Sequence, residues 1–406
     1  MKILIVNKFL YPRGGSESYM LGIGKTLKKL GHEVEYFGMY DEKNTVENRL
    51  GEYTQNMDFH KKSLERLLYP FKIIYSFESK KKIGKVIDEM QPDVIHLNNI
   101  NFQLTPSIID AAKKRHVPVV WTLHDYQLIC PGHLLYNNDR NCVCEKCIGR
   151  GKSACIKDKC IHSSKIKSIL GVIEAKFYKI KGTYKKVDRF IAPSNFLYKK
   201  LVADNRPLFE NRTTVIHNFV NKKTLPEKVK NNFGFPYIAF AGRLSPEKGT
   251  RILKDAARLL PDVDFVVMGG GPDEKMLSGI PNIHLTGFVT GKTLDENIAG
   301  AEAVAVPSVC FENCPMAILE GQQLAVPAVT MNMGGMAELV EDGKTGVLSK
   351  SVDAESFAAA VKDILSDRKR LAEMKENCLE NAKTFSDTDA YCEKLLGIYA
   401  EVINNG

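Results

Sequence analysis

The chain has 406 residues, 44% of them hydrophobic, which is enough for two or three domains with large cores. It opens on MKILIVNKF, a strand pattern rather than a secretory signal, and no apolar run reaches the roughly 18 residues of a membrane span. We therefore expect a cytoplasmic protein, in which the ten cysteines are reduced thiols or metal ligands rather than disulfides.

The net charge of +9 is divided unevenly along the chain. Residues 1–216 hold 37 Lys and Arg against 22 Asp and Glu, a net of +15, and the remaining residues hold 20 against 26, a net of −6. The two halves are therefore expected to meet different partners. A basic half suits nucleic acid or an anionic membrane surface, although solvated surface lysines give the same count.

The first half begins with a βαβ pattern. A strand at Ile3–Val6 precedes a loop with Gly14 and Gly15, a helix from about Ser16 to Gly31 and a strand at Glu33–Phe37. Ligands of open α/β sheets bind at such loops, but a tight turn uses the same glycines, and the G-x-G-x-x-G dinucleotide pattern is absent. Further strands are predicted at Val94–Leu97, Val117–Leu123, Arg189–Ala192 and Thr213–His217.

His124 and Asp125 follow the strand at Val117–Leu123, so we expect them at the carboxyl edge of the first sheet. A histidine there is as often a hydrogen-bonded structural group as a catalytic one. Its place opposite the donor site predicted in the second half favours catalysis.

Two stretches of the first half have apolar residues at helical spacing with lysines around them: Lys61–Met90, interrupted by Pro70, and Ser163–Lys186. Both are typical of basic amphipathic helices. Their apolar faces either pack on the domain's own sheet or face an anionic membrane. In the second stretch the apolar residues are Ile166, Ile169, Leu170, Ile173, Phe177 and Ile180.

The segment between Cys130 and His162 is rich in cysteine. Cys144-x-x-Cys147 has the spacing of a zinc knuckle, and Cys155 and Cys160 could complete a tetrahedral site. A structural zinc, with ligands drawn from these four residues and Cys142, would hold a long loop of little apolar content in shape. Free reduced thiols and a redox or iron–sulfur role are the alternatives.

After a linker rich in lysine and asparagine, the pattern restarts with a strand at Tyr237–Phe240 and the turn AGRLSPEKG. In this turn Gly242 allows close backbone approach, and Arg243 and Lys248 are two cations suited to a diphosphate. Strands follow at Phe265–Met268, Ile283–Thr286, Ala303–Val306 and Ala328–Met331, and helices follow at Ala354–Leu365, Arg368–Thr384 and Asp387–Ile403.

The stretch FENCPMAILEG, residues 311–321, is the most informative. It places Glu312 in a loop and Glu320 on the helix behind it, with Asn313 as the expected helix cap and Pro315 in the first turn. A helix start of this kind favours phosphate, and the two carboxylates can bind sugar hydroxyls. The stretch therefore predicts a site for a sugar nucleotide.

Taken together, the motifs resemble the retaining family 4 glycosyltransferases of the GT-B type, over nearly the whole chain. This resemblance implies two doubly wound α/β, Rossmann-like domains facing a cleft: residues 1–218, with the cysteine-rich insertion at 130–162, and residues 219–385. It also implies that residues 386–406 return to the first domain as a helix. The motifs are Gly14–Gly15, His124, AGRLSPEKG, VMGGGP, LTGFV, Glu312-x7-Glu320 and MGGMAELVEDGKTG.

Carried over by position, the resemblance assigns the donor diphosphate to Arg243 and Lys248 and the ribose hydroxyls to Glu320. Glu312 and His124 would contact the transferred sugar. The remaining donor contacts would come from Gly14, Gly15, Gly242, Gly287, Phe288, Asn313, Cys314, Pro315 and Met316. Many relatives have Phe-Gly after the first glutamate where this chain has Asn313–Cys314, which leaves the sugar preference open.

The resulting expectation is transfer of a hexose or N-acetylhexosamine from a UDP or GDP sugar to a lipid-linked or polysaccharide acceptor, at the inner membrane face. No catalytic metal is expected, because Arg243 and Lys248 supply positive charge and Asp262-Val-Asp264 opens a strand at the wrong edge of the sheet. A sugar-nucleotide epimerase and a zinc-containing nucleic-acid-binding protein are the alternatives. The basic helices lack interleaved aromatics, and the acidic half would repel nucleic acid, which disfavours the second alternative.

Overall fold

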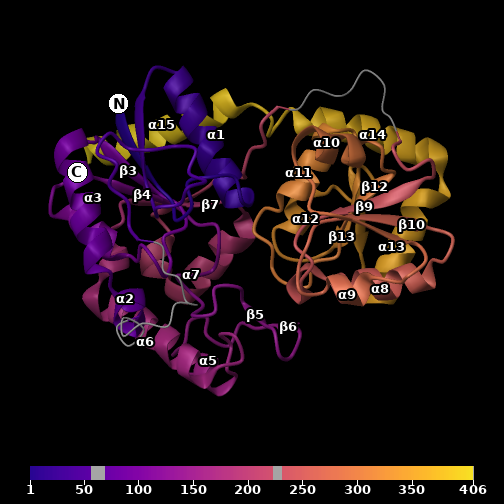
Figure 1. The fold of residues 1–406 in the computed structure, drawn as a ribbon, viewed down its shortest axis with the longest axis horizontal. Coiled ribbons are helices and arrows are strands. Elements are labelled where there is room, and N and C mark those ends of the chain that lie inside the picture. The colour runs from indigo at the N-terminus through magenta and orange to yellow at the C-terminus, as the bar shows by residue number, and fades with distance from the viewer. Residues whose placement is uncertain (56–68, 223–230, 406) are drawn as a thin grey trace. The chain divides into compact units, whose positions relative to one another are not determined.

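The computed structural model describes residues 1–55, 69–222 and 231–405. The chain divides into two compact units (Figure 1). Unit 1 comprises Met1–Leu134, Glu145–His217 and Thr388–Gly406, and unit 2 comprises Leu135–Cys144 and Asn218–Asp387. The short segment Leu135–Cys144 therefore departs from the expectation of a first domain that contains the whole cysteine-rich insertion.

The sheet of unit 1 has six parallel strands in the described residues, in the order β2-β1-β3-β4-β7-β8. Its inner strands read as continuous apolar runs because helices cover both faces of a doubly wound sheet. Apart from one-residue to two-residue differences at strand ends, the strands lie where the sequence predicts them. They are β1 (Lys2–Val6), β2 (Glu33–Phe37), β3 (Val94–Leu97), β4 (Val119–Thr122), β7 (Arg189–Ala192) and β8 (Thr213–Val215).

Several helices of unit 1 begin at a capping serine. Ser76 accepts a hydrogen bond from the Ser79 amide, and Ser164 accepts one from the Lys167 amide. Gly182, in the left-handed conformation, ends α6. The helices are α1 (Gly15–Lys29), α2 (Tyr69–Ile74), α3 (Phe77–Met90), α4 (Ser107–Lys113), α5 (Ala154–Lys157), α6 (Lys165–Lys181), the 3-10 helix η2 (Thr183–Lys186), α7 (Asn195–Phe209) and α15 (Thr388–Asn404).

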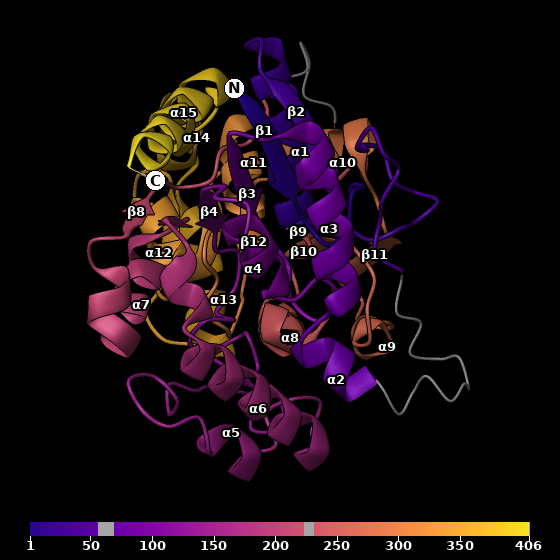
Figure 2. The ribbon, with the colours of Figure 1, turned by 90° about the vertical axis from the view of Figure 1, so that its left-hand side faces the viewer.

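The two basic stretches predicted to be amphipathic helices are helical where the structure describes them. Of Lys61–Met90, the part up to residue 68 lies outside the described residues, and the rest forms α2 and α3. Ser163–Lys186 forms α6 and η2, and α6 lies beside α5 and α2 (Figure 2). The C-terminal helix α15 packs against α1, so the end of the chain belongs to unit 1.

The sheet of unit 2 also has six parallel strands in the described residues, in the order β11-β10-β9-β12-β13-β14. Strand β14 is an edge strand that the sequence analysis did not predict. The strands are β9 (Tyr237–Ala241), β10 (Asp264–Met268), β11 (Ile283–Gly287), β12 (Ala303–Val306), β13 (Ala328–Met331) and β14 (Gly346–Ser349); β5 (Tyr136–Asn137) and β6 (Cys142–Val143) form a separate antiparallel hairpin.

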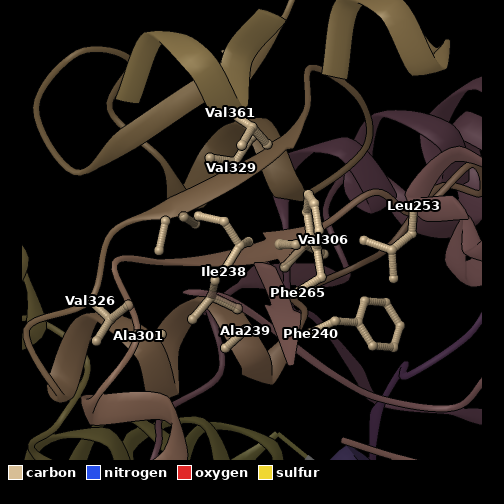
Figure 3. Close-up of a cluster of buried hydrophobic side chains, with 14 of the residues drawn as sticks. Ile238, Ala239, Phe240, Leu253, Phe265, Ala301, Val306, Val326, Val329 and Val361 are labelled. Carbon is tan, nitrogen blue, oxygen red and sulfur yellow. The ribbon is translucent and has the colours of Figure 1, made fainter. Parts of the chain in front are cut away.

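The core of unit 2 forms between this sheet and its helices. Figure 3 shows Val361 of α13 pointing toward Val329 of β13, with Ile238 and Phe265 from neighbouring strands in the same cluster. The helices are the 3-10 helix η3 (Pro246–Lys248), α8 (Thr250–Leu259), α9 (Glu274–Leu277), α10 (Gly291–Ala299), α11 (Met316–Gln323), α12 (Met336–Leu339), α13 (Ala354–Ser366) and α14 (Arg368–Ala382).

Candidate active site

The strand order of unit 2 reverses at β9, whose neighbours are β10 and β12. Open parallel sheets bind ligands at such a switch point, outside the carboxyl ends of the strands. The loop after β9 carries Gly242, Arg243 and Lys248, and the loop after β12 carries Glu312 and Asn313. The topology thus brings the two most informative motifs of the sequence to one place.

Lys248 and Glu312 meet directly across these two loops. Lys248 Nζ lies 2.6 Å from Glu312 Oε1, and Ser308 Oγ donates a hydrogen bond of 2.9 Å to the same oxygen. The Glu312 side chain is 14% exposed and that of Lys248 is 35% exposed. Among the described residues Glu312 Oε2 has no hydrogen-bond partner, so this oxygen can accept a bond from a sugar hydroxyl.

Burial acts to lower the pKa of Lys248, but the Glu312 carboxylate outweighs it, and the net effect is a raised pKa. Lys248 therefore stays a cation over the physiological pH range. A partly buried cation beyond the carboxyl end of a strand is placed to stabilise negative charge on a phosphate leaving group.

Glycines allow the loops of this site to approach closely. A Cβ at Gly249, where φ is +74°, would lie 1.8 Å from the Pro307 carbonyl oxygen, and one at Gly335 would lie 1.7 Å from the Asn313 carbonyl oxygen. The Gly335 amide also donates to the Glu312 carbonyl oxygen at 2.7 Å. The backbone around Glu312 is therefore held from two sides.

Helix α11 begins directly after this loop. Its N-cap is Pro315 and its first residue is Met316, so the prediction that Asn313 caps the helix is wrong. Asn313 instead lies buried two residues before the cap, because its peptide packs against Gly335. Cys314 is also buried, which raises its pKa to about 12 and keeps it a neutral thiol. Glu320 lies half-buried in the second turn of α11.

The remaining predicted donor residues of unit 2 lie at the carboxyl ends of β9 and β11. Arg243 is exposed and has no ion-pair partner in the described part of the chain. Gly242 follows β9 and donates its amide hydrogen to the Met268 carbonyl oxygen. At the end of β11, Gly287 has φ of +72° and Phe288 is 79% exposed, which suits stacking against a flat base.

In unit 1, Gly14 and Gly15 lie at the start of α1, exposed and outside the carboxyl end of β1. Gly14 is the N-cap and provides no side-chain hydrogen bond, so the first amides of α1 lie open toward an anion. Glu17, in the first turn, is buried and accepts a hydrogen bond from Asn7 Nδ2 at 3.2 Å. This bond ties the helix start to the end of β1.

His124 is held by Asn98, which follows the neighbouring strand β3. His124 Nε2 lies 2.9 Å from Asn98 Oδ1, while Asn98 Nδ2 faces the Val6 carbonyl oxygen at 3.5 Å. Because the Asn98 amide nitrogen faces a carbonyl, its oxygen faces His124, and His124 donates from Nε2. Burial lowers the pKa of His124 to about 4, so the ring is neutral and its Nδ1 carries a lone pair.

Behind His124, a buried hydrogen-bonded group links unit 1 to its C-terminal helix. His96 bonds to Thr122 Oγ1 at 2.8 Å and to the Tyr399 hydroxyl of α15 at 2.5 Å. Tyr19 of α1 contacts the His124 ring edge to face at 5.0 Å and bonds to the Tyr391 hydroxyl at 2.7 Å. Helix α15 thus stabilises the buried residues that pack behind His124.

The comparisons with known proteins agree with this geometry. Residues 13–224, more than half of the chain, match the family model of Glycosyltransferase Family 4. The chain belongs to this family. Residues 221–384 match the model of Glycosyl transferases group 1, so the two matches together cover both units and confirm the resemblance drawn from the motifs.

Solved structures show the GT-B fold of this family 4 chain. It is similar to Anabaena HepE in complex with UDP, with a TM-score of 0.67, 21% identity and coverage of 99% of this chain and 100% of that one. Among curated relatives, it is 30% identical over 178 residues to alpha-D-kanosaminyltransferase of Streptomyces kanamyceticus and 32% identical over 167 residues to a GDP-mannose-dependent alpha-mannosyltransferase of Corynebacterium glutamicum. Each match covers 41% of this chain, with 46% and 40% of the relatives, so the chain spans less than half the length of these curated relatives.

Three residues that support the site of this family 4 chain are not among those predicted from the sequence. Asn98 sets the tautomer of His124, and Ser308 bonds to Glu312. Tyr136, from the hairpin of the cysteine-rich insertion, packs against Val309 and Cys310 in the loop that carries Glu312. The position of Asn98 at a strand's carboxyl end was an available signal, whereas nothing in the sequence connects Tyr136 to that loop.

The cysteines of the insertion are distributed between the two units. Cys142 and Cys144 lie in the hairpin that clusters with unit 2, whereas Cys147 and Cys155 are buried in unit 1 against Val172 of α6. A hydrogen bond with Cys160, burial, and the nearby Cys130 and Cys147 thiols raise the pKa of Cys155. Within the described residues, no group of three or more His, Cys, Asp or Glu side chains is arranged to hold a metal ion.

None of the helices formed by the described residues is both long enough and apolar enough to cross a membrane.

Proposed function

We propose that the chain is a retaining glycosyltransferase that moves a sugar from a nucleoside-diphosphate sugar to a lipid-linked or polysaccharide acceptor. The observation that carries the proposal is the 2.6 Å ion pair between Lys248 and Glu312 at the switch point of the second sheet. The relatives support it, because those named above are glycosyltransferases. The UDP complex of HepE and the GDP-mannose donor of the mannosyltransferase support a UDP or GDP sugar.

In this proposal unit 2 holds the donor. Arg243 and Lys248 bind the diphosphate, together with backbone amides at the start of α11 and the peptide of Asn313–Pro315. Glu320 binds the ribose hydroxyls. Glu312 binds hydroxyls of the transferred sugar through Oε2, which the structure leaves available among the described residues. Phe288 and Gly287 lie beside the base.

The reaction breaks the bond between the anomeric carbon and the diphosphate oxygen and forms a bond from that carbon to the acceptor hydroxyl oxygen. The electron pair leaves with the diphosphate, and the acceptor proton passes to a phosphate oxygen on the same face of the sugar. Negative charge grows on the phosphate, so Arg243 and Lys248 stabilise the transition state more than the ground state. No catalytic metal is part of this proposal.

Unit 1 contributes the groups that meet the sugar and the acceptor. The neutral His124 ring accepts a hydrogen bond from a sugar hydroxyl through Nδ1, and the open start of α1 at Gly14–Gly15 favours the diphosphate. The basic balance of residues 1–216 supports an acceptor that carries anionic phosphate, such as a lipid-linked glycan used in cell-surface assembly.

The test begins with a panel of UDP and GDP sugars in a thermal-shift assay. A donor at 100 times its dissociation constant stabilises the protein by about 2.7 kcal/mol, which raises the melting temperature measurably. The best donor is then incubated with lipid-linked acceptors, and NMR of the product gives the anomeric configuration. Retention supports the proposal, and nucleotide release that needs no acceptor supports an epimerase. If no nucleoside-diphosphate sugar stabilises the protein, the proposal is wrong.

We also propose that the cysteine-rich insertion binds a structural zinc. Thiolates are preferred zinc ligands, and Cys147, Cys155 and Cys160 belong both to the predicted ligand set and to the thiol cluster of unit 1. Elemental analysis of protein purified without chelator should give about one zinc per chain, lost in a Cys147→Ser/Cys155→Ser variant and kept in Cys378→Ser. Zinc content measured in Cys130→Ser and in Cys144→Ser tests which of these residues is the fourth ligand. If the protein contains no zinc and is as stable without added zinc as with it, the proposal is wrong.

A further inference from the structure

One side of α6 exposes large apolar side chains to solvent. Ile166 is 73% exposed, Ile173 is 45% exposed, Phe177 is 36% exposed and Ile180 is 87% exposed. At about 100° per residue, these four residues lie within roughly 60° of the helix circumference. They form a continuous apolar stripe along a helix of 17 residues. We call this stripe the α6 face.

Helix α6 turns most of this stripe away from the rest of the described part of unit 1, although Phe177 contacts the rings of Tyr75 and Tyr178 at 5.8 Å and 5.2 Å. Its buried side chains are Ser168, Val172, Glu174 and Tyr178, which point away from the stripe. Tyr178 donates a hydrogen bond to the Ile74 carbonyl oxygen of α2. The sequence left two alternatives for the apolar residues of this helix: packing on the domain's own sheet, or facing an anionic membrane. For the residues of the α6 face the first alternative is wrong, because their side chains point outward.

The apolar surface continues onto the start of α3. Phe77 is 76% exposed, and its ring lies 5.0 Å from that of Tyr75. Tyr75 in turn contacts the Phe177 ring at 5.8 Å. Aromatic residues at the end of an apolar stripe are typical of the boundary between lipid headgroups and acyl chains.

Lysines flank the α6 face on both sides. On the helix circumference, Lys165 and Lys176 lie about 80–100° to one side of Ile166, and Lys167 and Lys181 lie about 60–100° to the other. Lys165, Lys167 and Lys176 are exposed and form no ion pair with another described residue. Lys181 pairs with Asp110 and lies over the Tyr75 ring at 5.3 Å.

We propose that the α6 face, together with Phe77, inserts into the surface of an anionic lipid bilayer, with Lys165, Lys167 and Lys176 at the lipid phosphates. Helix α6 would lie in the plane of the interface, since none of the described helices can cross a membrane. A second copy of this chain fits the surface poorly, because a symmetric contact would bring the same lysines together. Nucleic acid fits it poorly, because isoleucines give bases no aromatic surface on which to stack.

This inference goes beyond the proposed function, since bilayer binding requires neither a donor nor turnover. It also gives the proposed lipid-linked acceptor a surface on which unit 1 can meet it. Its failure would leave the nucleotide-binding test unaffected, so the two proposals fail separately.

The experiment is sedimentation of the full chain with phosphatidylcholine vesicles that contain or lack phosphatidylglycerol, at about 0.01 M ionic strength, where charges are weakly screened. We expect binding to the anionic vesicles and little to the neutral ones. Ile166→Glu/Ile173→Glu/Ile180→Glu should lower binding at least about tenfold. Lys165→Gln/Lys176→Gln should lower it about fivefold per lysine and reduce its salt dependence. The matched control is Leu259→Glu/Val352→Glu, two exposed apolar residues of unit 2, which should bind as the parent does.

Each variant should keep the melting temperature and the nucleotide-dependent thermal shift of the parent, because the changed side chains are exposed. The proposal is overturned if the parent ignores anionic vesicles, or if the triple glutamate variant binds them equally well. It is also overturned if light scattering shows a parent dimer that the triple variant converts to a monomer, since the occupant of the face is then a second copy.

Discussion

Lys248 Nζ lies 2.6 Å from Glu312 Oε1, joining the loop after β9 to the loop after β12. These residues are 64 positions apart in the chain and belong to two separate sequence motifs. The carboxylate keeps Lys248 charged against the effect of burial. When a diphosphate binds, the Lys248 ammonium lies between the Glu312 carboxylate and the phosphate. Glu312 therefore sets both the protonation state and the position of Lys248.

Glu312→Gln tests this pairing. The amide keeps the shape of the side chain but removes its charge, so Lys248 loses its ionic partner. We expect turnover to fall about 10²- to 10³-fold, affinity for nucleoside diphosphate to be kept, and the free energy of unfolding to fall by about 1–2 kcal/mol. Steady-state kinetics, calorimetry and urea unfolding measure the three quantities, with the exposed Glu355→Gln as control. Unchanged turnover would exclude a catalytic role for Glu312.

Glu320→Gln should weaken binding of the nucleotide itself. A carboxylate that accepts hydrogen bonds from two ribose hydroxyls contributes about 1.5–3 kcal/mol per charged hydrogen bond, so we expect the dissociation constant for UDP or GDP to rise at least about tenfold. Titration calorimetry measures this directly. The control is Glu373→Gln, an exposed carboxylate of α14 in the same unit. Equal affinity in the Glu320 variant would contradict its assignment to the ribose.

His124→Ala should spare nucleotide binding and reduce turnover, because His124 lies in unit 1 and is assigned to the sugar. Asn98→Ala, which removes the partner of His124 Nε2, should reduce kcat with little change in KM. Asn98→Asp keeps an acceptor for that nitrogen and should recover part of the activity. The Asn98 variant distinguishes a positioning role from a structural one, since a purely structural residue would change stability and leave the kcat of folded enzyme unaltered.

Stability should fall as the pH is lowered below about 6.5, because two histidines are held neutral. Burial lowers the pKa of His124 to about 4, and burial together with the neighbouring His124 ring lowers the pKa of His96 to about 3. The unfolded chain therefore binds protons first, and each histidine costs up to about 1.4 kcal/mol per pH unit between its unfolded and folded pKa values. Urea unfolding at about pH 7.5 and at pH 5 gives the loss in the free energy of unfolding between these two pH values. This loss should be about 2 kcal/mol smaller in His96→Gln than in the parent. The same pH dependence in both proteins would mean that His96 is not held neutral.

Gly335→Ala should disrupt the donor loop. The new Cβ would lie 1.7 Å from the Asn313 carbonyl oxygen, so the backbone beside Glu312 must move. We expect a loss of about 1–3 kcal/mol in the free energy of unfolding and a loss of nucleotide binding. Gly397→Ala in α15 is the matched control, since nothing lies within 4 Å of its Cβ, and it should stabilise by about 0.5–1 kcal/mol. A Gly335 variant with normal binding would show that the loop adapts without moving Glu312.

Much of the fold could be predicted because the signals that specify it are local. Apolar runs predicted the bounds of β3, β7, β12 and β13 as the structure has them, since a strand buried on both faces leaves no alternation to misread. The helix cap before α11 was predicted wrongly, because Asn313 is drawn into contact with the loop after β13, and that contact is not visible in the neighbouring residues.

The sequence by itself determined which residues lie at the ends of strands, and hence that Arg243, Lys248, Glu312 and His124 lie at ligand-binding edges. Only the tertiary structure decided their partners: Glu312 for Lys248, Asn98 for His124, and the hairpin around Tyr136 for the loop of Glu312. It also decided that the apolar stripe of α6 faces outward. The reason is that periodicity reports the surroundings of a residue within one element, whereas a partner depends on strand order, which joins residues far apart in the chain.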